Sequence, residues 1–187
     1  MKVNKVNVKP QTMLYPVPSV MVSCRNKKGE NNIITISWVG VVSSDPPMLS
    51  IAVRPERHSF NMIQETKEFV VNLPDEKLLY ENDFCGVKSG KNVNKFQELQ
   101  LTAIKGQYVK APLIGECPVN MECKVKEVIN LGSHHLFIAE IINLQVNEEY
   151  VKDQQVDLEN CRFFTYQKGT YHGLGEVLGK VGLSVRR

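Results

Sequence analysis

Arginine, histidine and serine side chains gather in one short stretch of the sequence, Arg54-Pro55-Glu56-Arg57-His58-Ser59-Phe60-Asn61. The stretch follows an apolar run that ends at Val53, and after it apolar residues recur at helical spacing. It therefore joins a predicted strand to a predicted helix over residues 59–67, with Ser59 or Asn61 as its cap. Backbone N–H groups at a helix start attract anions, and arginines beside them strengthen that attraction. The pattern favours a phosphate-binding site; the alternative is an ordinary strand-to-helix junction with solvated arginines.

Two apolar runs lead into this junction and predict an apolar wall beside the anion site. Ile33 to Gly40 alternates isoleucine and tryptophan with small hydroxyl residues, and Met48 to Val53 follows a turn at Ser43-Ser44-Asp45-Pro46-Pro47. β-branched and aromatic residues bounded by Asp-Pro-Pro indicate two strands joined by a tight connection. The only tryptophan, Trp38, is expected to pack in the core in preference to contacting a ligand.

A second candidate binding segment is the loop Cys85–Lys95, which contains three lysines and two glycines. Loops on a rigid scaffold often carry binding residues. A solvated basic loop without a binding role is the alternative.

Turn residues divide the rest of the chain into short strands with few helices. Val119–Val125 alternates apolar with polar residues, which predicts a strand with one buried and one solvated face. Leu136–Val146 is more uniformly apolar, so both of its faces are expected to be covered, one of them by a second subunit. The other expected elements are strands at Val17–Arg25 and Phe69–Leu73, a hairpin turn at Asn26–Gly29, and a helix over Asp75–Phe84 capped by Asp75. Such a series predicts one mainly β domain over residues 1–187, a closed or nearly closed barrel with helical excursions.

Composition narrows the classes of function. The 187 residues carry a net charge of only +3, which does not favour nucleic-acid or membrane binding. No signal peptide or membrane-spanning run is recognisable, so a cytoplasmic protein is expected. The cysteines are odd in number, widely spaced and without a CxxC motif, which disfavours a disulfide framework or a metal site. Cys24, Cys85, Cys117, Cys123 and Cys161 are therefore expected to be small buried apolar residues.

Several motifs, in the same order along the chain, resemble those of the flavin reductase-like family, and of its flavoredoxin branch in particular. They are Tyr15-Pro16-Val17-Pro18, Thr35-Ile36-Ser37-Trp38-Val39-Gly40, Asp45-Pro46-Pro47, Arg54 to Asn61, and Ser89-Gly90-Lys91 with Asn94-Lys95-Phe96. Gly132 to Glu140 is similar to the family's Gly-Asp-His-x-x-Phe-x-Gly-Glu, with His134 as the matching histidine and Ser133 and Ala139 as departures. Tyr166 and Tyr171, with Gly173-Leu174-Gly175, resemble the closing segment.

The resemblance implies a mainly β, FMN-binding split barrel (Greek-key-like) with a few short helices, present as a homodimer with the flavin near the interface. It also implies non-covalent FMN. Arg54, Ser59, Lys91 and Lys95 are the candidates for the phosphate. The full set of implied cofactor-binding residues is Thr35, Ile36, Ser37, Trp38, Arg54, Arg57, His58, Ser59, Asn61, Ser89, Lys91, Lys95 and Tyr171.

The activity expected from the resemblance is that of an FMN-binding oxidoreductase or electron-transfer flavoprotein. Reducing equivalents would pass from NAD(P)H through FMN to free flavin, oxygen or a protein partner, and His134 is the catalytic candidate, as the residue that orients the nicotinamide. The chain has no GxGxxG motif after a strand, so NAD(P)H is expected to bind transiently. The alternatives are a dimeric barrel that acts as a ligand-binding or sensing module with weak or no flavin, and a nucleic-acid-binding barrel, which the mild charge disfavours.

Overall fold

The computed structural model describes residues 3–185 and contains a seven-stranded antiparallel sheet with the strand order β3-β2-β6-β9-β10-β5-β4. Alternating apolar residues direct one face of most of these strands into a shared core. The strands are β2 (Val20–Arg25), β3 (Asn31–Ile36), β4 (Val39–Ser44), β5 (Pro47–Val53), β6 (Glu68–Leu73), β9 (Val119–Asn130) and β10 (His135–Val146).

The sheet closes on itself at Ser37 and Trp38. These two residues alone separate β3 from β4, yet the two strands lie at opposite ends of the strand order. A flat sheet of seven strands would be about 29 Å wide at ~4.8 Å per strand, whereas this short link spans roughly 10 Å. The sheet must therefore curl until its edges meet. The Ala52 N–H donates to the Trp38 carbonyl over 2.9 Å, which continues the β4–β5 pairing up to the break. The expectation of one continuous strand from Ile33 to Gly40 was wrong, because closure requires a break there.

Helix α1 (His58–Thr66) packs Phe60, Met62 and Ile63 into the barrel core. Its N-cap is Arg57, with no side-chain cap, so the prediction that Ser59 or Asn61 caps this helix was wrong. The helix ends where Lys67 adopts a left-handed backbone with φ of 58° and donates its N–H to the Ile63 carbonyl.

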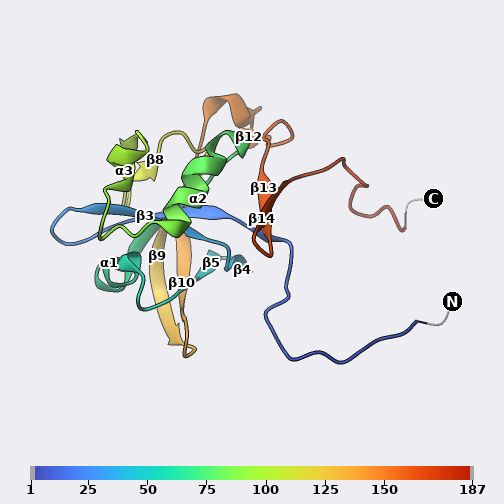
Figure 1. Ribbon diagram of the computed structural model, residues 1–187. Helices are drawn as coiled ribbons and strands as arrows, with labels where there is room; N and C mark the ends of the chain where they lie inside the picture. Colours follow the sequence, from blue (N-terminus) through green and yellow to red (C-terminus); the bar gives the residue numbers. More distant parts are fainter. Residues whose placement is uncertain (1–2, 186–187) are drawn as a thin grey trace.

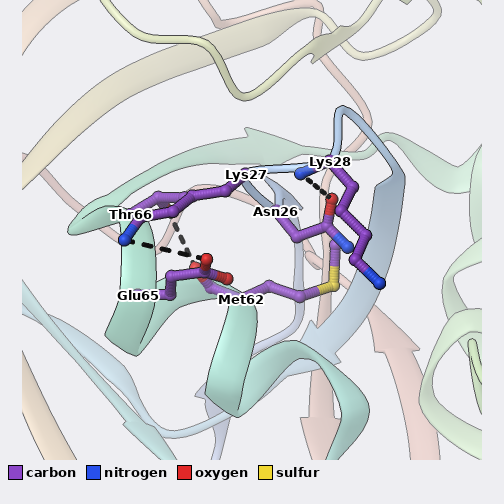
Figure 2. Close-up of polar contacts among 6 residues, drawn as sticks. All are labelled: Asn26, Lys27, Lys28, Met62, Glu65 and Thr66. Atoms are coloured by element: carbon purple, nitrogen blue, oxygen red, sulfur yellow. Dashed lines mark hydrogen bonds and ion pairs between the residues drawn. The ribbon is translucent and has the colours of Figure 1, made fainter.

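The predicted hairpin turn between β2 and β3 lies beside this helix (Figure 2). The Asn26 side chain accepts the Lys28 N–H over 3.0 Å, which stabilises the turn. Figure 2 also shows Lys27 reaching from the turn to Glu65 of α1, 3.8 Å away, while the Thr66 hydroxyl donates to the Met62 carbonyl. The Lys27–Glu65 pair is exposed and so contributes little stability.

Two further helical segments cover the outside of β2 and β3. Asp75 accepts the Lys77 N–H over 3.1 Å, which confirms its predicted capping role. Figure 1 shows α2 crossing this face of the sheet. The segments are a 3₁₀ turn (Glu76–Leu78) running into α2 (Leu79–Val87), followed by α3 (Lys95–Glu98).

The predicted strand Val17–Arg25 is split at Ser19, so that its first two residues join a separate sheet with the order β1-β13-β14. The remaining short elements are β1 (Val17–Pro18), β7 (Ala103–Ile104), β8 (Leu113–Ile114), a 3₁₀ turn (Glu148–Tyr150), β11 (Val151–Lys152), β12 (Gln155–Val156), β13 (Phe164–Gln167) and β14 (Thr170–Gly173).

Glu122 on β9 shows that the predicted solvated face of this strand is partly buried. Its carboxylate is inaccessible to solvent and accepts three consecutive backbone N–H groups, from Gln107, Tyr108 and Val109, and the Asn143 and Gln145 amides. Burial alone would raise the pKa of Glu122, but the hydrogen bonds outweigh it and the pKa is lowered. The half-buried prediction failed here because the loop over residues 105–113 covers the polar face.

All five cysteines are free and buried, which confirms the prediction for them. Burial raises the pKa of Cys24 and Cys123 to about 12 and that of Cys85 to about 11. These thiols therefore stay protonated and unreactive at neutral pH. Within residues 3–185, no group of three or more His, Cys, Asp or Glu side chains is arranged to hold a metal ion.

Both ends of the chain leave the barrel as irregular arms on the same side (Figure 1). Residues 3–16 form no helix or strand, and residues 174–185 contain only turns and irregular backbone. Both arms expose aliphatic side chains such as Val6, Leu14 and Val177. No helix in the described part of the chain is long and apolar enough to cross a membrane.

Candidate functional site

Two adjoining cavities lie where β3, the end of β5 and the start of α1 meet. The first, here called the α1 cavity, has a volume of about 360 Å³ and lies between the start of α1 and the end of α2. The second, the Trp38 cavity, is also about 360 Å³ and lies along the β3–β4 junction. Both are lined by Ile34, Arg54 and Arg57, so they form one elongated site.

The α1 cavity is strongly cationic. It is lined by Arg54, Arg57, Lys88 and Lys95, against a single carboxylate, Glu56. That carboxylate lies 3.4 Å from the Arg54 guanidinium, in an exposed ion pair. The excess of positive charge at a helix start favours an anionic ligand, and the hydroxyls of two serines that line the same cavity add neutral donors.

Lys95 connects two elements of the fold within this cavity. Its side chain is almost fully buried, and its ammonium donates to the Ile33 carbonyl over 2.6 Å and to the Cys85 carbonyl over 2.7 Å. Burial lowers the pKa of this lysine. Two of its three N–H donors thus join β3 to the end of α2, and one remains for a ligand.

Gly90 brings backbone directly against the floor of the α1 cavity. A β-carbon at this position would come within 2.1 Å of Asn32 Oδ1. Asn32 is buried, and its Nδ2 donates to the Ser59 hydroxyl over 2.7 Å. The loop after α2, β3 and the start of α1 therefore meet through Gly90, Asn32 and Ser59, and only glycine permits that approach.

The Trp38 cavity has an aromatic wall. Trp38 is 44% exposed, and its ring centroid lies 4.6 Å from that of His134, with 34° between the planes. The expectation that Trp38 packs in the core was wrong, because the strand break turns this residue out of the barrel. Ser133 Oγ lies 3.0 Å from His134 Nδ1, within hydrogen-bonding distance. Tyr166 of β13 also lines the cavity.

Two histidines in the site favour their neutral form. Burial, and then the charge of Lys91, lowers the pKa of His58. Burial, and then the charge of Arg54, lowers the pKa of His134. Both rings are therefore neutral at pH 7 in the ligand-free protein.

Comparison with known proteins identifies the relatives of this chain. The sequence matches the flavin reductase like domain over residues 12–175. The chain belongs to the flavin reductase-like family. Its relatives include a protein of Archaeoglobus fulgidus, 34% identical over 150 residues that cover 80% of this chain and 82% of the relative. Another, from Aquifex aeolicus, is 30% identical and covers 90% and 84%.

Solved structures of family members share the fold. Flavoredoxin of Desulfovibrio vulgaris (Miyazaki F) superposes with a TM-score of 0.89 at 28% identity, and the match covers 98% of this chain and all of that one. Flavoredoxin of Methanosarcina acetivorans gives the same values. These matches confirm the predicted split barrel and the resemblance to the flavoredoxin branch, and they support a flavin-related oxidoreductase.

Most residues that the family resemblance implied as flavin-binding line one of the two cavities. Thr35, Ile36, Ser37 and Trp38 line the Trp38 cavity, as does the catalytic candidate His134. Arg54 and Arg57 line both cavities, while His58, Ser59, Ser89 and Lys95 line the α1 cavity.

Three of the implied residues lie elsewhere. Asn61 is exposed on α1 and lines neither cavity. Lys91 lines a third hollow beyond the α1 cavity. The Tyr171 hydroxyl donates to Asp83 over 2.9 Å, and burial together with this bond raises its pKa to about 12. Its ring packs against that of Tyr166, which lines the Trp38 cavity, with 5.7 Å between the ring centroids.

Several residues of the site were not predicted. Asn32 precedes an apolar run, and nothing in the local pattern indicates that its side chain turns inward. Gly86 allows α2 to approach β3, since a β-carbon there would lie 3.3 Å from Thr35 Cβ. For Lys88, the only indication in the sequence of a binding role was its position in the basic loop Cys85–Lys95. Asn94, which the resemblance included in its motif, caps α3 by accepting the Gln97 N–H over 3.3 Å.

Proposed function

We propose that this protein is an FMN-dependent oxidoreductase that passes reducing equivalents from NADH or NADPH to free flavin, oxygen or a protein acceptor. The observation that carries the proposal is the pair of adjoining cavities. One is cationic and built at a helix start, the other is flanked by aromatic rings, and Arg54 and Arg57 line both. An anionic tail on a flat, largely apolar ring system matches this arrangement, and FMN has that shape.

The donors in the α1 cavity fit a phosphomonoester. Arg54 and Arg57 supply charge-assisted donors, and the Ser59 and Ser89 hydroxyls supply neutral ones. The close approach at Gly90 lets backbone, without a side chain, form part of the wall. Lys95 adds positive charge and one free N–H, because its other two are bonded to carbonyls. We therefore assign the phosphate to this cavity.

The Trp38 cavity fits the ring system. Ile34 and Ile36 of β3 provide apolar surface, and the Ser37 hydroxyl provides a polar contact at its edge. The Thr35 hydroxyl donates to the Asn82 carbonyl and is left as an acceptor. A flavin held by these residues would supply the hydride-accepting and two-electron chemistry of the reaction. The protein binds and orients the reactants.

His134 is the residue we propose to orient the nicotinamide. It borders the Trp38 cavity, stacks on Trp38 and is held by Ser133. With Nδ1 beside the Ser133 hydroxyl, the neutral imidazole has Nε2 free for one hydrogen bond to the carboxamide of a nicotinamide, and it adds no second positive charge. The ring also shields one side of the cavity from water.

We further propose a cytoplasmic homodimer. Val6 and Leu14 on the N-terminal arm are more than 80% exposed, as is Val177 on the C-terminal arm. Val41 on the edge strand β4 is 78% exposed. Apolar surface of this extent supports a second copy of the chain as its cover. Light scattering of the purified protein tests the dimer.

The visible spectrum of freshly purified protein tests the proposed cofactor. We expect flavin absorption, release of FMN on heating as identified by chromatography, and bleaching when NADH or NADPH is mixed in a stopped-flow instrument. A colourless protein that also fails to bind added FMN would contradict the proposal and favour a sensing or ligand-binding barrel. If the protein is yellow but neither nucleotide bleaches it, the proposed cofactor stands and the proposed electron donor is wrong.

A further inference from the structure

A third hollow, here called the loop trough, continues outward from the α1 cavity. Its volume is about 710 Å³, and it shares His58 and Gly90 with the α1 cavity. One side is the hairpin turn at residues 29–31, and the other is the loop at residues 90–94. The trough thus begins where the α1 cavity, the proposed phosphate site, ends.

We propose that the loop trough binds the adenosine 5′-phosphate half of a dinucleotide. FAD consists of FMN joined through its phosphate to adenosine 5′-phosphate, so the second half would pass from the α1 cavity into the trough. This inference rests on the proposed FMN site. The same adenylate chemistry also occurs in NAD(P)H, which is the other possible source.

The size and charge of the trough suit an adenylate group. Small-molecule sites are typically about 300–1,000 Å³, and the trough falls within this range. Lys91 lines the trough and not the α1 cavity. It therefore stands where a second phosphate would lie, past the one bound by Arg54 and Arg57.

Two side chains of the trough offer acceptor oxygens that suit hydroxyl and amino donors, Glu30 and Asn31. Asn31 Oδ1 is buried and accepts no hydrogen bond from any residue within 3–185. The last torsion of an asparagine side chain is soft, so this amide turns toward a ligand at little cost. Glu30 also lines the trough, and one of its carboxylate oxygens accepts from the Asn26 amide over 2.5 Å. A phosphate offers no donor to these acceptors, whereas a ribose hydroxyl or the adenine amine does.

An apolar surface completes the trough. Val93 is half-buried, and Phe96 is 8% exposed at the start of α3. These two side chains provide a wall against which a purine ring can pack. A site for an inorganic anion alone would not need this wall.

Isothermal titration of the purified, flavin-free protein with FMN and with FAD tests the inference. Asn92 is an exposed residue of the trough, so Asn92→Trp fills the space and Asn92→Ala is its matched control. We expect Asn92→Trp to weaken FAD binding tenfold or more and FMN binding less than threefold. We expect Asn92→Ala to change neither by more than threefold. Lys91→Ala should weaken FAD selectively by about tenfold, the usual effect of losing one charge-assisted hydrogen bond.

A second arm identifies the source of the adenylate. If the KM for NADH of the FMN-loaded protein rises in Asn92→Trp while FAD and FMN affinities stay in their original ratio, the trough binds the adenylate of the nicotinamide nucleotide. If neither the FAD affinity nor this KM responds to Asn92→Trp or Lys91→Ala, the inference is wrong, although the FMN site stands. Failure of the parent protein to bind FMN would instead overturn the proposed function itself.

Discussion

The Asn32 amide lies directly beneath Gly90, so that a β-carbon on residue 90 would come within 2.1 Å of Asn32 Oδ1. The same amide donates to the Ser59 hydroxyl at the start of α1. One buried side chain therefore fixes the distance between the loop after α2 and the helix that together form the anion site. Neither partner can move without the other, because interiors are close-packed.

Substituting Gly90→Ala tests this arrangement. We expect the loop to be pushed off Asn32, with a loss of about 1–3 kcal/mol of stability, as is typical of overpacking. FMN should bind about tenfold more weakly, measured by titration of flavin fluorescence. Gly40→Ala is the control, since a β-carbon there has no atom within 4 Å. Equal effects of the two substitutions would show that the Gly90–Asn32 approach does not shape the site.

Substituting Arg54 and Lys91 tests which cation binds the FMN phosphate. We assign Arg54 to that phosphate and Lys91 to the loop trough. Arg54 lines both cavities, whereas Lys91 lines only the trough. We expect Arg54→Ala to raise the Kd for FMN about 10- to 100-fold, the usual cost of losing hydrogen bonds to a charged group. Adding Lys91→Ala should raise it further by less than threefold. Lys27→Ala, on the hairpin turn, is the surface control. Unchanged FMN affinity in the double variant would refute the phosphate assignment.

The barrel was predictable because its signals are local. Asp45-Pro46-Pro47 marks the β4–β5 hairpin, Asn26 to Gly29 marks the β2–β3 turn, and alternation marks the first half of β9. The break at Ser37 was not predictable, since Ile33 to Gly40 has uninterrupted strand propensity. The break follows from closure of a seven-stranded sheet, which is a property of the whole chain.

The site was predicted through the family resemblance more than through local pattern. Arg54 to Ser59 carries its own physical signal, because charged residues follow a strand and begin a helix. Asn32 and Glu122 carry none, since a buried polar residue has the same sequence appearance as an exposed one. Their burial is determined by segments remote in sequence: helix α1 and the loop at Gly90 cover Asn32, and the loop at Val109 covers Glu122.

Lys95 is predicted to stabilise the fold as well as the ligand. Lys95→Met removes the donor from two buried carbonyls, those of Ile33 and Cys85. An unsatisfied buried acceptor costs about 1–3 kcal/mol, so we expect a loss of about 2–4 kcal/mol in the free energy of unfolding without flavin. Urea denaturation measures it. Lys88→Met is the control, because this exposed lysine lines the same cavity. An unaltered denaturation midpoint in Lys95→Met would mean that the lysine serves the ligand alone.

His58 and His134 predict how the stability of the flavin-free protein depends on pH. The pKa of each ring is lowered from its ordinary value of 6.5, first by burial and then by Lys91 or Arg54, respectively. Below about pH 6.5 the unfolded chain holds protons on these rings that the folded protein does not. Unfolding therefore takes up protons, and stability should fall as the pH decreases from 6.5 toward the lowered pKa values. Between pH 7 and 8 the two rings should contribute no slope.

The measurement for this prediction is urea denaturation at closely spaced pH values from 5 to 8, in the parent and in a His58→Gln, His134→Gln variant. Carboxylates such as Glu122, whose pKa is also lowered, add a slope of the same sign at lower pH in both proteins. The difference between the two curves isolates the histidines, and the parent should lose more stability on acidification below pH 6.5. Parallel curves would show that neither ring titrates differently in the folded and unfolded states.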